Sequence, residues 1–245
     1  MTGWLFIAGL GPGSDALMTP EVSAALDEAS DIVGYSTYVD RLKPRLGVAL
    51  HSSDNREELK RARDALALAE DGRNVVIVSS GDPGVFAMAA AVFEAIEGEP
   101  RWQKLDIRVL PGITAMLAAA AAAGAPLGHD FCAINLSDNL KPWELIERRL
   151  RLATEADLAL ALYNPRSKSR PQGFAKALGV LRETCGTDRL VTFARAVSTP
   201  EQTIVTVELG EAVPEMADMQ TVVIVGNSST RQVGNWIYTP RRAVS

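Results

Sequence analysis

The sequence predicts an α/β protein in which much of the sheet is parallel. Short apolar runs alternate with helical patterns along the chain, which is typical of this fold class. Five apolar runs end in tight loops rich in glycine, proline or asparagine, and these loops begin at Gly9, Ser80, Pro111, Tyr163 and Gly226. Ligands of open α/β sheets bind beyond the carboxyl ends of strands, so we expect these loops to face a ligand.

Composition narrows the class of protein. The 245 residues suffice for one large domain or two ordinary ones, and 47% hydrophobic with 22% charged residues is typical of soluble globular proteins. The formal net charge of −5 gives no support for a nucleic-acid partner. The two cysteines, Cys132 and Cys185, are far apart, which argues against a zinc or disulfide framework and favours a reducing cytoplasm.

Neither the start of the chain nor its apolar stretches indicate a membrane. The first residues have no basic segment followed by an apolar one, so no signal peptide is predicted. The longest apolar stretch, residues 115–125, is mostly alanine and is too short to cross a bilayer. We therefore expect a cytoplasmic protein that makes no contact with a membrane.

Local signals predict the elements of the first half. Thr19 and Pro20 begin a helix as a cap and a first helical proline, and apolar residues at 22, 25, 26 and 29 share one face of it. The other elements expected here are strands over residues 4–8, 31–35, 75–79 and 107–110 and helices over 56–70 and 85–96.

The second half begins with an alanine-rich helix that Thr114 can cap and Gly124 can end. The further elements expected are helices over residues 142–152 and 173–184 and strands over 158–162, 190–194, 202–208 and 221–225. The end of the chain is richer in strands than the first half. We expect two domains, an N-terminal α/β domain over residues 1–114 and a C-terminal α/β domain over residues 115–245.

The first loop fails as a dinucleotide-binding fingerprint. Ser14 stands where the third glycine is needed, and the strand over residues 31–35 is followed by Ser36 instead of an acidic residue. Pro12 also removes a backbone N–H from the kind of loop that cradles phosphate. The pattern therefore argues against a dinucleotide-dependent oxidoreductase.

Two other loops carry polar chemistry. The turn from Gly81 to Gly84 exposes carbonyl groups and the Asp82 carboxylate, which suits a cation or a zwitterion; an ordinary Asp-Pro turn is the alternative. Arg166, Lys168 and Arg170 place three cations within five positions after a strand. At a strand end they predict a pocket for carboxylates, and a solvated loop is the alternative.

The chain lacks the usual signatures of nucleophilic and metal catalysis. His51 and His129 are the only histidines, and neither has the spacing of a metal ligand or stands beside a nucleophile. We therefore expect no metal. An enzyme with these residues would depend on positioning, which fits transfer of a group from an already activated donor.

Taken in order, these loops resemble those of the tetrapyrrole methylases, which use S-adenosylmethionine. The resemblance covers almost the whole chain, and its family-wide segments are residues 9–19, 79–83 and 110–114. More specific segments are residues 34–38, 136–138, 162–168, 193–198 and 224–230. These resemble the branch of the family that methylates C17 of precorrin-3B and contracts the macrocycle to precorrin-4 in cobalamin biosynthesis.

The resemblance implies a fold of two α/β domains with a cleft between them, a homodimer and a bound S-adenosylmethionine. The residues that it implies around this cofactor are Pro12, Gly81, Asp82, Val85, Thr114, Ala115, Asn164, Ala196 and Val197. The implied reaction is C17 methylation with extrusion of C20. Relatives that act on uroporphyrinogen carry an aspartate where this chain has Ser36, which disfavours that substrate.

The carboxylate arms of a tetrapyrrole need cations, which Arg166, Lys168 and Arg170 can supply, with Arg195 and Arg231 as further candidates. Ring contraction needs a proton donor or acceptor, and our hypothesis is Asp138. The alternative is that Asp138 or Asn139 caps the helix that begins near Pro142.

Three rival functions stay open at this point. The substrate can be the cobalt-containing analogue of the oxygen-independent route, cobalt-factor III. The chain can instead be a dinucleotide-dependent precorrin reductase, which the broken glycine pattern disfavours. It can also be a tetrapyrrole carrier without catalysis, which would need the cationic loop but not Gly81 and Asp82.

Overall fold

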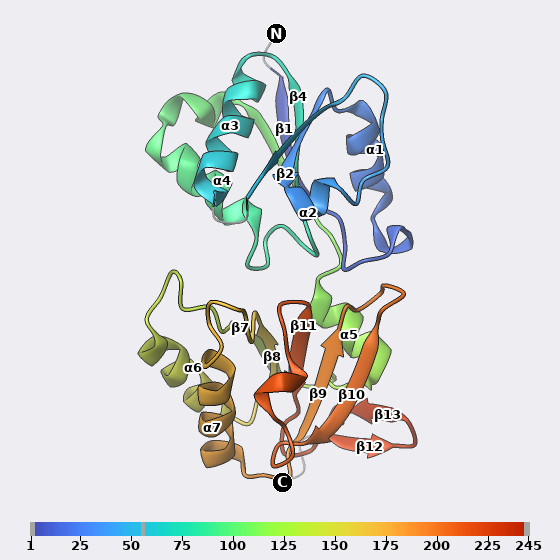
Figure 1. Ribbon diagram of the computed structural model, residues 1–245, viewed down its shortest axis with the longest axis vertical. Helices are drawn as coiled ribbons and strands as arrows, with labels where there is room; N and C mark the ends of the chain where they lie inside the picture. Colours follow the sequence, from blue (N-terminus) through green and yellow to red (C-terminus); the bar gives the residue numbers. More distant parts are fainter. Residues whose placement is uncertain (1–2, 55–56, 243–245) are drawn as a thin grey trace. The chain divides into compact units, whose positions relative to one another are not determined.

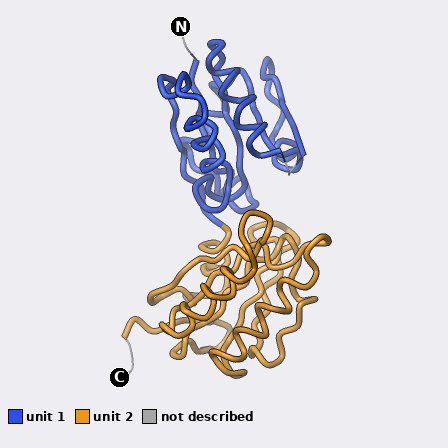
Figure 2. Tube along the Cα trace, turned by 90° about the vertical axis from the view of Figure 1, so that its left-hand side faces the viewer, with its two compact units in different colours: residues 1–114 blue, residues 115–245 orange. Residues whose placement is uncertain are grey.

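The computed structural model describes residues 3–54 and 57–242. Its internal contacts divide the chain into two compact units, Met1–Thr114 and Ala115–Ser245, which are called unit 1 and unit 2 below (Figure 2). Each unit contains its own five-stranded sheet and is described by itself. Among the described residues, no helix combines the length and apolar character that crossing a membrane requires.

Unit 1 is a parallel sheet with helices on both faces (Figure 1). Its strands, in the spatial order β3-β2-β4-β1-β5, are β3 (Ala49–Ser53), β2 (Asp31–Tyr35), β4 (Asn74–Ser79), β1 (Trp4–Gly9) and β5 (Asp106–Leu110). Its helices are α1 (Pro20–Glu28), α2 (Ser36–Val39), α3 (Glu58–Glu70) and α4 (Met88–Gly98), with 3-10 turns at Asp15–Leu17 and Pro100–Lys104. All five carboxyl ends lie at one edge of this sheet.

Side-chain alternation divides the core of unit 1 between the two faces of the sheet. Leu5 and Ile7 of β1 pack with α3 and α4, whereas Ala8 and Leu10 pack with α1. The predicted start of α1 is confirmed, because Thr19 is the N-cap and its Oγ1 accepts the N–H of Val22 at 3.3 Å. Burial of apolar residues on both faces thus holds the strand ends in register.

A buried carboxylate joins three strands at the opposite edge of unit 1. Asp31, the first residue of β2, is 1% exposed. It accepts hydrogen bonds from Ser30 Oγ at 2.7 Å and Arg73 Nε at 2.7 Å, and it lies 2.8 Å from His51 Nε2. Burial alone would raise the pKa of Asp31, but the bonds from Arg73, Ser30 and His51 outweigh it and lower the pKa below its ordinary value of 3.8. His51 therefore has a structural role.

Helix α4 begins later than the sequence pattern indicates. The expected helix over 85–96 starts at Met88, because Phe86 has a left-handed φ of 56° and Ala87 is extended. These two residues break the helical path after the turn at Gly84. The loop after β4 is therefore longer by three residues than the apolar periodicity predicts.

Unit 2 contains a mixed sheet with the spatial order β10-β9-β11-β8-β7. These strands are β10 (Thr203–Glu208), β9 (Leu190–Arg195), β11 (Thr221–Val225), β8 (Ala159–Tyr163) and β7 (Phe131–Asn135). Helices α6 (Trp143–Glu155) and α7 (Gly173–Cys185) pack on one face around Phe174, and α5 (Ala115–Ala123) packs against β11. A small sheet of β6 (Gly124–Ala125), β13 (Trp236–Tyr238) and β12 (Arg231–Val233) completes the unit, with a 3-10 turn at Pro214–Met216.

Strand direction separates the loops of unit 2 into two groups. Strands β7 and β8 are parallel, and β11 is antiparallel to both β8 and β9. The carboxyl ends of β7, β8 and β9 therefore share one edge, and the loop from Gly226 after β11 lies at the other. Within unit 2, the expectation that the Gly226 loop shares an edge with the loop after β8 is wrong, because β11 runs antiparallel to β8.

Candidate functional site

The loops that follow β1 and β4 are joined through their backbones. Gly11 donates its N–H to the carbonyl of Gly81 at 3.1 Å, and Gly81 donates to the carbonyl of Gly11 at 2.8 Å. Both residues are left-handed, with φ of 73° and 64°. Glycine is suited to this conformation because it has no Cβ, so the local sequence explains the paired turns.

The Asp82 carboxylate connects the loops after β4 and β5. Its Oδ1 accepts the N–H of Gly84 at 2.8 Å, and its Oδ2 accepts the N–H of Gly112 at 3.0 Å. The sequence predicts a carboxylate open to a cation or zwitterion. In the structure each oxygen already has a backbone donor, so the first role of Asp82 is to hold two loops together.

The same loops touch at their glycines. A Cβ on Gly112 would lie 2.1 Å from the Gly81 carbonyl oxygen, and a Cβ on Gly9 would lie 2.5 Å from that oxygen. No side chain fits at either position without moving the backbone. Gly9, Gly81 and Gly112, which we call the glycine floor, therefore present backbone atoms at the carboxyl edge of unit 1.

The predicted cofactor residues of unit 1 lie on these loops. Pro12, Asp82 and Val85 are half-buried, and Gly81 is buried. Thr114, at the end of unit 1, is 5% exposed. The Val85 N–H donates to the carbonyl of Asp82 at 3.3 Å, which fixes the start of the longer loop before α4.

Left-handed residues mark the corresponding loops of unit 2. Asn164, after β8, has φ of 52°, and Ala196 and Ser198, after β9, have φ of 46° and 66°. Such conformations strain residues that carry a Cβ, and they concentrate at functional sites. The Ala196 N–H donates to the carbonyl of Gln220 at 2.9 Å, and Val197 is buried, so this turn is tied to the strand beside it.

Two contacts that the sequence did not predict support this edge of unit 2. Asn164 Nδ2 donates to Asn135 Oδ1 at 3.1 Å, and the same oxygen accepts the N–H of Ser137 at 2.9 Å. Tyr163 Oη accepts the N–H of Met116 at 3.0 Å, next to the predicted cofactor residue Ala115. The only signal for Asn135 and Tyr163 is their place at the ends of β7 and β8.

The three cations after β8 have different surroundings. Lys168 is exposed, and Arg166 Nη2 lies 3.5 Å from Glu215 with a third of its side chain exposed. The Arg170 side chain is 11% exposed, and its Nη1 donates to the carbonyls of Leu136 and Asn164 at 3.4 and 3.3 Å. Arg166 and Lys168 therefore retain solvent access, whereas Arg170 is engaged by the protein.

Asp138 does not cap the helix that follows it. Helix α6 begins at Trp143 with Pro142 at the N-cap, and no side chain makes a cap hydrogen bond there. The alternative that Asp138 or Asn139 caps this helix is therefore wrong. The Asp138 side chain is 46% exposed, and its Oδ1 lies 3.9 Å from Arg170 Nε.

The two further arginine candidates lie at different edges of unit 2. Arg195, the last residue of β9, donates from Nε to Asp218 Oδ2 at 2.8 Å. Burial would raise the pKa of Asp218, but the bonds from Arg195, Thr221 and the N–H of Gln220 lower it. Arg231 is exposed in β12 and lies over the Tyr238 ring, in the three-stranded sheet and not in the sheet that contains β7, β8 and β9.

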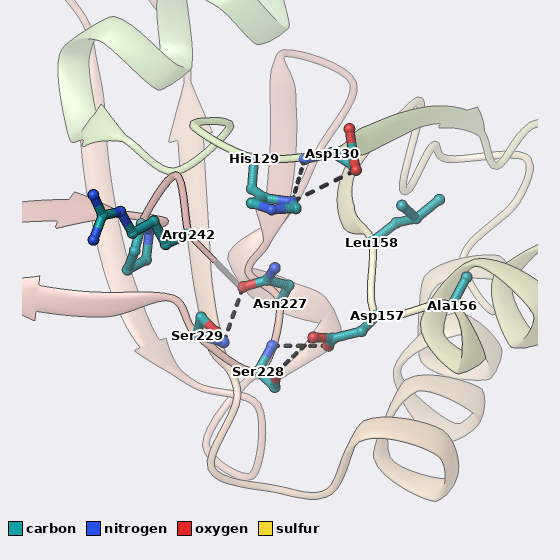
Figure 3. Close-up of a pocket in the computed structure, with 10 residues that line it drawn as sticks. His129, Asp130, Ala156, Asp157, Leu158, Asn227, Ser228, Ser229 and Arg242 are labelled. Atoms are coloured by element: carbon teal, nitrogen blue, oxygen red, sulfur yellow. Dashed lines mark hydrogen bonds and ion pairs between the residues drawn. The ribbon is translucent and has the colours of Figure 1, made fainter. Parts of the chain in front are cut away.

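A pocket of about 210 Å³ lies at the other edge of the unit 2 sheet (Figure 3). Its lining includes His129, Asp130, Asp157, Asn227 and Ser228. Asp157 accepts from the Ser228 N–H at 2.9 Å and from Arg189 at 3.0 Å. Burial would raise the pKa of Asp157, but bonds from Ser228 and Arg189 lower it. The pocket contains none of the predicted site residues. Its Asp157 carboxylate holds the loop that begins at Gly226 through the bond from Ser228.

Metal ligands are not grouped in the part of the chain that the structure describes. Within residues 3–54 and 57–242, no three histidine, cysteine, aspartate or glutamate side chains form a group that could hold a metal ion. Cys132 and Cys185 are free thiols. The loops at the carboxyl ends of the strands offer backbone groups, the side chains of Arg166 and Lys168, and the half-exposed carboxylate of Asp138.

Comparison with known proteins now defines the class. The family of tetrapyrrole (corrin/porphyrin) methylases matches residues 5–213, so the chain belongs to this family. A precorrin-3B C(17)-methyltransferase from Sinorhizobium sp is 52% identical over 98% of this chain and 97% of its own length. The crystal structure of the methyltransferase CobJ superposes with a TM-score of 0.96 at 66% identity, covering 97% of this chain and all of that one.

A second branch of the family is more distant. A probable cobalt-factor III C(17)-methyltransferase from Salmonella typhimurium is 40% identical over 97% of this chain and 98% of its own. The predicted family, the α/β fold and the class of enzyme are therefore confirmed, and the chain is an S-adenosylmethionine-dependent methyltransferase.

Proposed function

We propose that this enzyme transfers a methyl group from S-adenosylmethionine to C17 of precorrin-3B and contracts the macrocycle to give precorrin-4, in cobalamin biosynthesis. The observation that carries the proposal is the 52% identity with a precorrin-3B C(17)-methyltransferase over almost the full length of both chains. The 40% identity with a cobalt-factor III enzyme makes the cobalt-containing substrate the second candidate.

The loops fit S-adenosylmethionine, whose bound sulfonium supplies an activated methyl group. In unit 1 the glycine floor leaves no room for a Cβ at Gly9 or Gly112, so a ligand there meets backbone carbonyl and N–H groups. We propose that Pro12, Gly81, Asp82, Val85 and Thr114 contact the cofactor. In unit 2 the proposed contacts are Ala115, at the start of α5, and Asn164, Ala196 and Val197, on or beside turns with left-handed backbone.

The substrate side of the proposal rests on charge. Precorrins carry several carboxylate arms, and partly exposed guanidinium and ammonium groups bind carboxylates. We propose that Arg166 and Lys168 meet these arms, with Arg195 as a further cation at the same edge of unit 2. Arg231 lies elsewhere, in β12, and is left out.

Asp138 is the proposed group for proton transfer during contraction. It follows β7 at the edge where Asn164 follows β8, and almost half of its side chain is exposed, which leaves the carboxylate accessible to a substrate. An aspartate in this position can accept a proton as the carboxylate, or donate one as the carboxylic acid, as the ring carbon changes its bonding. Methyl transfer itself needs mainly alignment of donor and acceptor, which we propose that the hydrogen-bonded loops supply.

The domain organisation, oligomeric state, cellular location and metal requirement of the enzyme are proposed as follows. We propose that units 1 and 2 are the two domains of the enzyme, that it acts as a homodimer in the cytoplasm, and that it needs no metal. Sedimentation of the purified protein measures its oligomeric state, and activity in the presence of a chelator tests the metal.

The test of the function is an incubation with S-adenosylmethionine and either precorrin-3B or cobalt-factor III, followed by mass and absorption analysis. A single added methyl with the spectrum of a contracted ring on precorrin-3B supports the proposal. Methylation of cobalt-factor III but not of precorrin-3B would show that the enzyme belongs to the oxygen-independent route. Binding of S-adenosylmethionine without methylation of either would overturn both substrates.

A further inference from the structure

Arg170 is surrounded differently from the two cations that precede it. Its side chain is 11% exposed, against 33% for Arg166. The turn that carries it is closed by its own N–H, which donates to Ser167 Oγ and to the Ser167 carbonyl, both at 3.1 Å. The chain therefore folds back after Lys168 and directs this guanidinium into the protein.

The guanidinium joins two strand-end loops that are separate in sequence. One nitrogen, Nη1, donates to the Leu136 carbonyl after β7 and to the Asn164 carbonyl after β8. On the other side, Nε lies 3.9 Å from Asp138 Oδ1. Arg170 thus contacts the loop of the proposed proton-transfer residue and the loop of a proposed cofactor residue at once.

A third loop completes the surroundings of this side chain. Nη2 lies 3.9 Å from the Met219 sulfur, in the segment that leads into β11. The Asn135–Asn164 amide contact crosses between the same two loops as Arg170. Two cross-links between the loops after β7 and β8 restrict their relative movement more than either one alone.

We infer that Arg170 is a positioning residue, which holds the Asp138 loop and the Asn164 loop in register, and that it does not bind the carboxylate arms of the substrate. This inference rests on the proposed function only for the roles of Asp138 and Asn164. Arg166 and Lys168 are then the cations of this segment that meet the substrate.

The geometry favours arginine over lysine here. The planar fork lets Nη1 and Nε contact the loop after β7 while Nη1 also contacts Asn164 and Nη2 faces Met219, whereas an ammonium group is a single point of charge. Lysine would therefore preserve a substrate-binding charge but not the cross-link. This difference separates the two roles experimentally.

The experiment compares Arg170→Lys and Arg170→Met with Arg166→Met, Lys168→Met and the exposed α6 control Arg149→Met. With precorrin-3B and S-adenosylmethionine, a positioning role predicts that both Arg170 variants lose kcat by about tenfold or more while KM for the tetrapyrrole changes less than about twofold. Arg166→Met and Lys168→Met should instead raise that KM with little change in kcat. Arg170→Lys near wild-type activity, with a raised KM in Arg170→Met, would overturn the inference.

A second readout does not depend on turnover. Hydrogen exchange measures the loops directly, and loss of the cross-link should speed exchange of peptides that cover residues 136–139 and 164–167 in both Arg170 variants but not in Arg149→Met. Unchanged exchange would also overturn the inference. If the wild-type enzyme fails to methylate precorrin-3B, the proposed function falls, and the exchange comparison still decides the role of Arg170.

Discussion

Gly112 donates its backbone N–H to Asp82 Oδ2 at 3.0 Å, and this bond joins the loop after β4 to the loop after β5. The other carboxylate oxygen accepts the N–H of Gly84 within the first loop. One side chain therefore orders two loops of the proposed cofactor site. The Asp82 carboxylate thus shapes the backbone of that proposed site through two charge-assisted hydrogen bonds.

Replacing Asp82 with asparagine should weaken the site. The amide has one acceptor oxygen, so its NH2 group must face one of the two glycine N–H donors, at a cost of about 1–2 kcal/mol. We expect a lower unfolding temperature and about tenfold weaker binding of S-adenosylmethionine, measured by calorimetry. Asp64→Asn on the exposed face of α3 is the matched control. Wild-type affinity in Asp82→Asn would show that the bridge is dispensable.

Adding one methyl group to the glycine floor should lower the stability of the folded protein far more than adding one to a glycine in an open position. In Gly112→Ala the new Cβ would lie 2.1 Å from the Gly81 oxygen, so the loops must separate, and we expect a loss of about 3 kcal/mol. Gly179 lies inside α7, where a Cβ meets nothing within 4 Å.

The control variant Gly179→Ala should therefore gain roughly 0.5–1 kcal/mol, because alanine is the better helix former. Urea unfolding of both variants measures the contrast. Equal stabilities would mean that the loops relax without cost.

The Asp31 cluster predicts a specific dependence of stability on pH. The pKa of Asp31 is lowered in the folded state, so the folded protein binds fewer protons than the unfolded chain near the ordinary value of 3.8. Its contribution is fully present above that value and is lost as pH falls through the folded pKa. Asp31→Asn should be less stable by about 2 kcal/mol at neutral pH, with the difference shrinking below pH 3.8.

Urea unfolding at neutral and acid pH checks this prediction, with Glu94→Gln on the exposed face of α4 as the control. A stability difference that persists unchanged in acid would assign the loss to packing instead of charge.

Asp138→Asn separates the two halves of the proposed reaction. The amide keeps the size of the side chain but cannot exchange a proton, so we expect methyl transfer to continue and contraction to slow by about 100-fold. Mass analysis counts the added methyl, and absorption reports the state of the macrocycle. Normal rates for both steps would remove Asp138 from the mechanism.

Continuous apolar strands were the easiest elements to predict. The strands predicted over residues 31–35 and 221–225 have the same bounds as β2 and β11. Both runs were recognisable because they are buried on the two faces of the sheet and are therefore mostly apolar. Strand β3 and the β12–β13 hairpin were missed, since β3 is mostly exposed without an apolar run, and β12 and β13 contain only three residues each. Apolar patterns in a sequence identify strands by the burial of their side chains, and few side chains of these strands are buried.

The candidate site was harder to predict because it depends on strand direction and on contacts between distant residues. Nothing in residues 221–225 indicates that β11 runs against β8, so the Gly226 loop was expected at the wrong edge. The roles of Asp82 and Arg170 follow from partners 30 and 34 residues away in the chain. Local patterns identify the residues of such a site but not their contacts.

The glycine floor also determines how the enzyme can be re-engineered. Its contacts join main-chain atoms of Gly9, Gly81 and Gly112, so laboratory evolution toward new methyl acceptors has nothing to gain at these positions. Libraries that randomise Arg166, Lys168 and Arg195 instead vary the charges proposed to meet the substrate, while the proposed cofactor scaffold stays intact. Selection for a new methyl acceptor can then proceed without rebuilding the proposed cofactor half of the site.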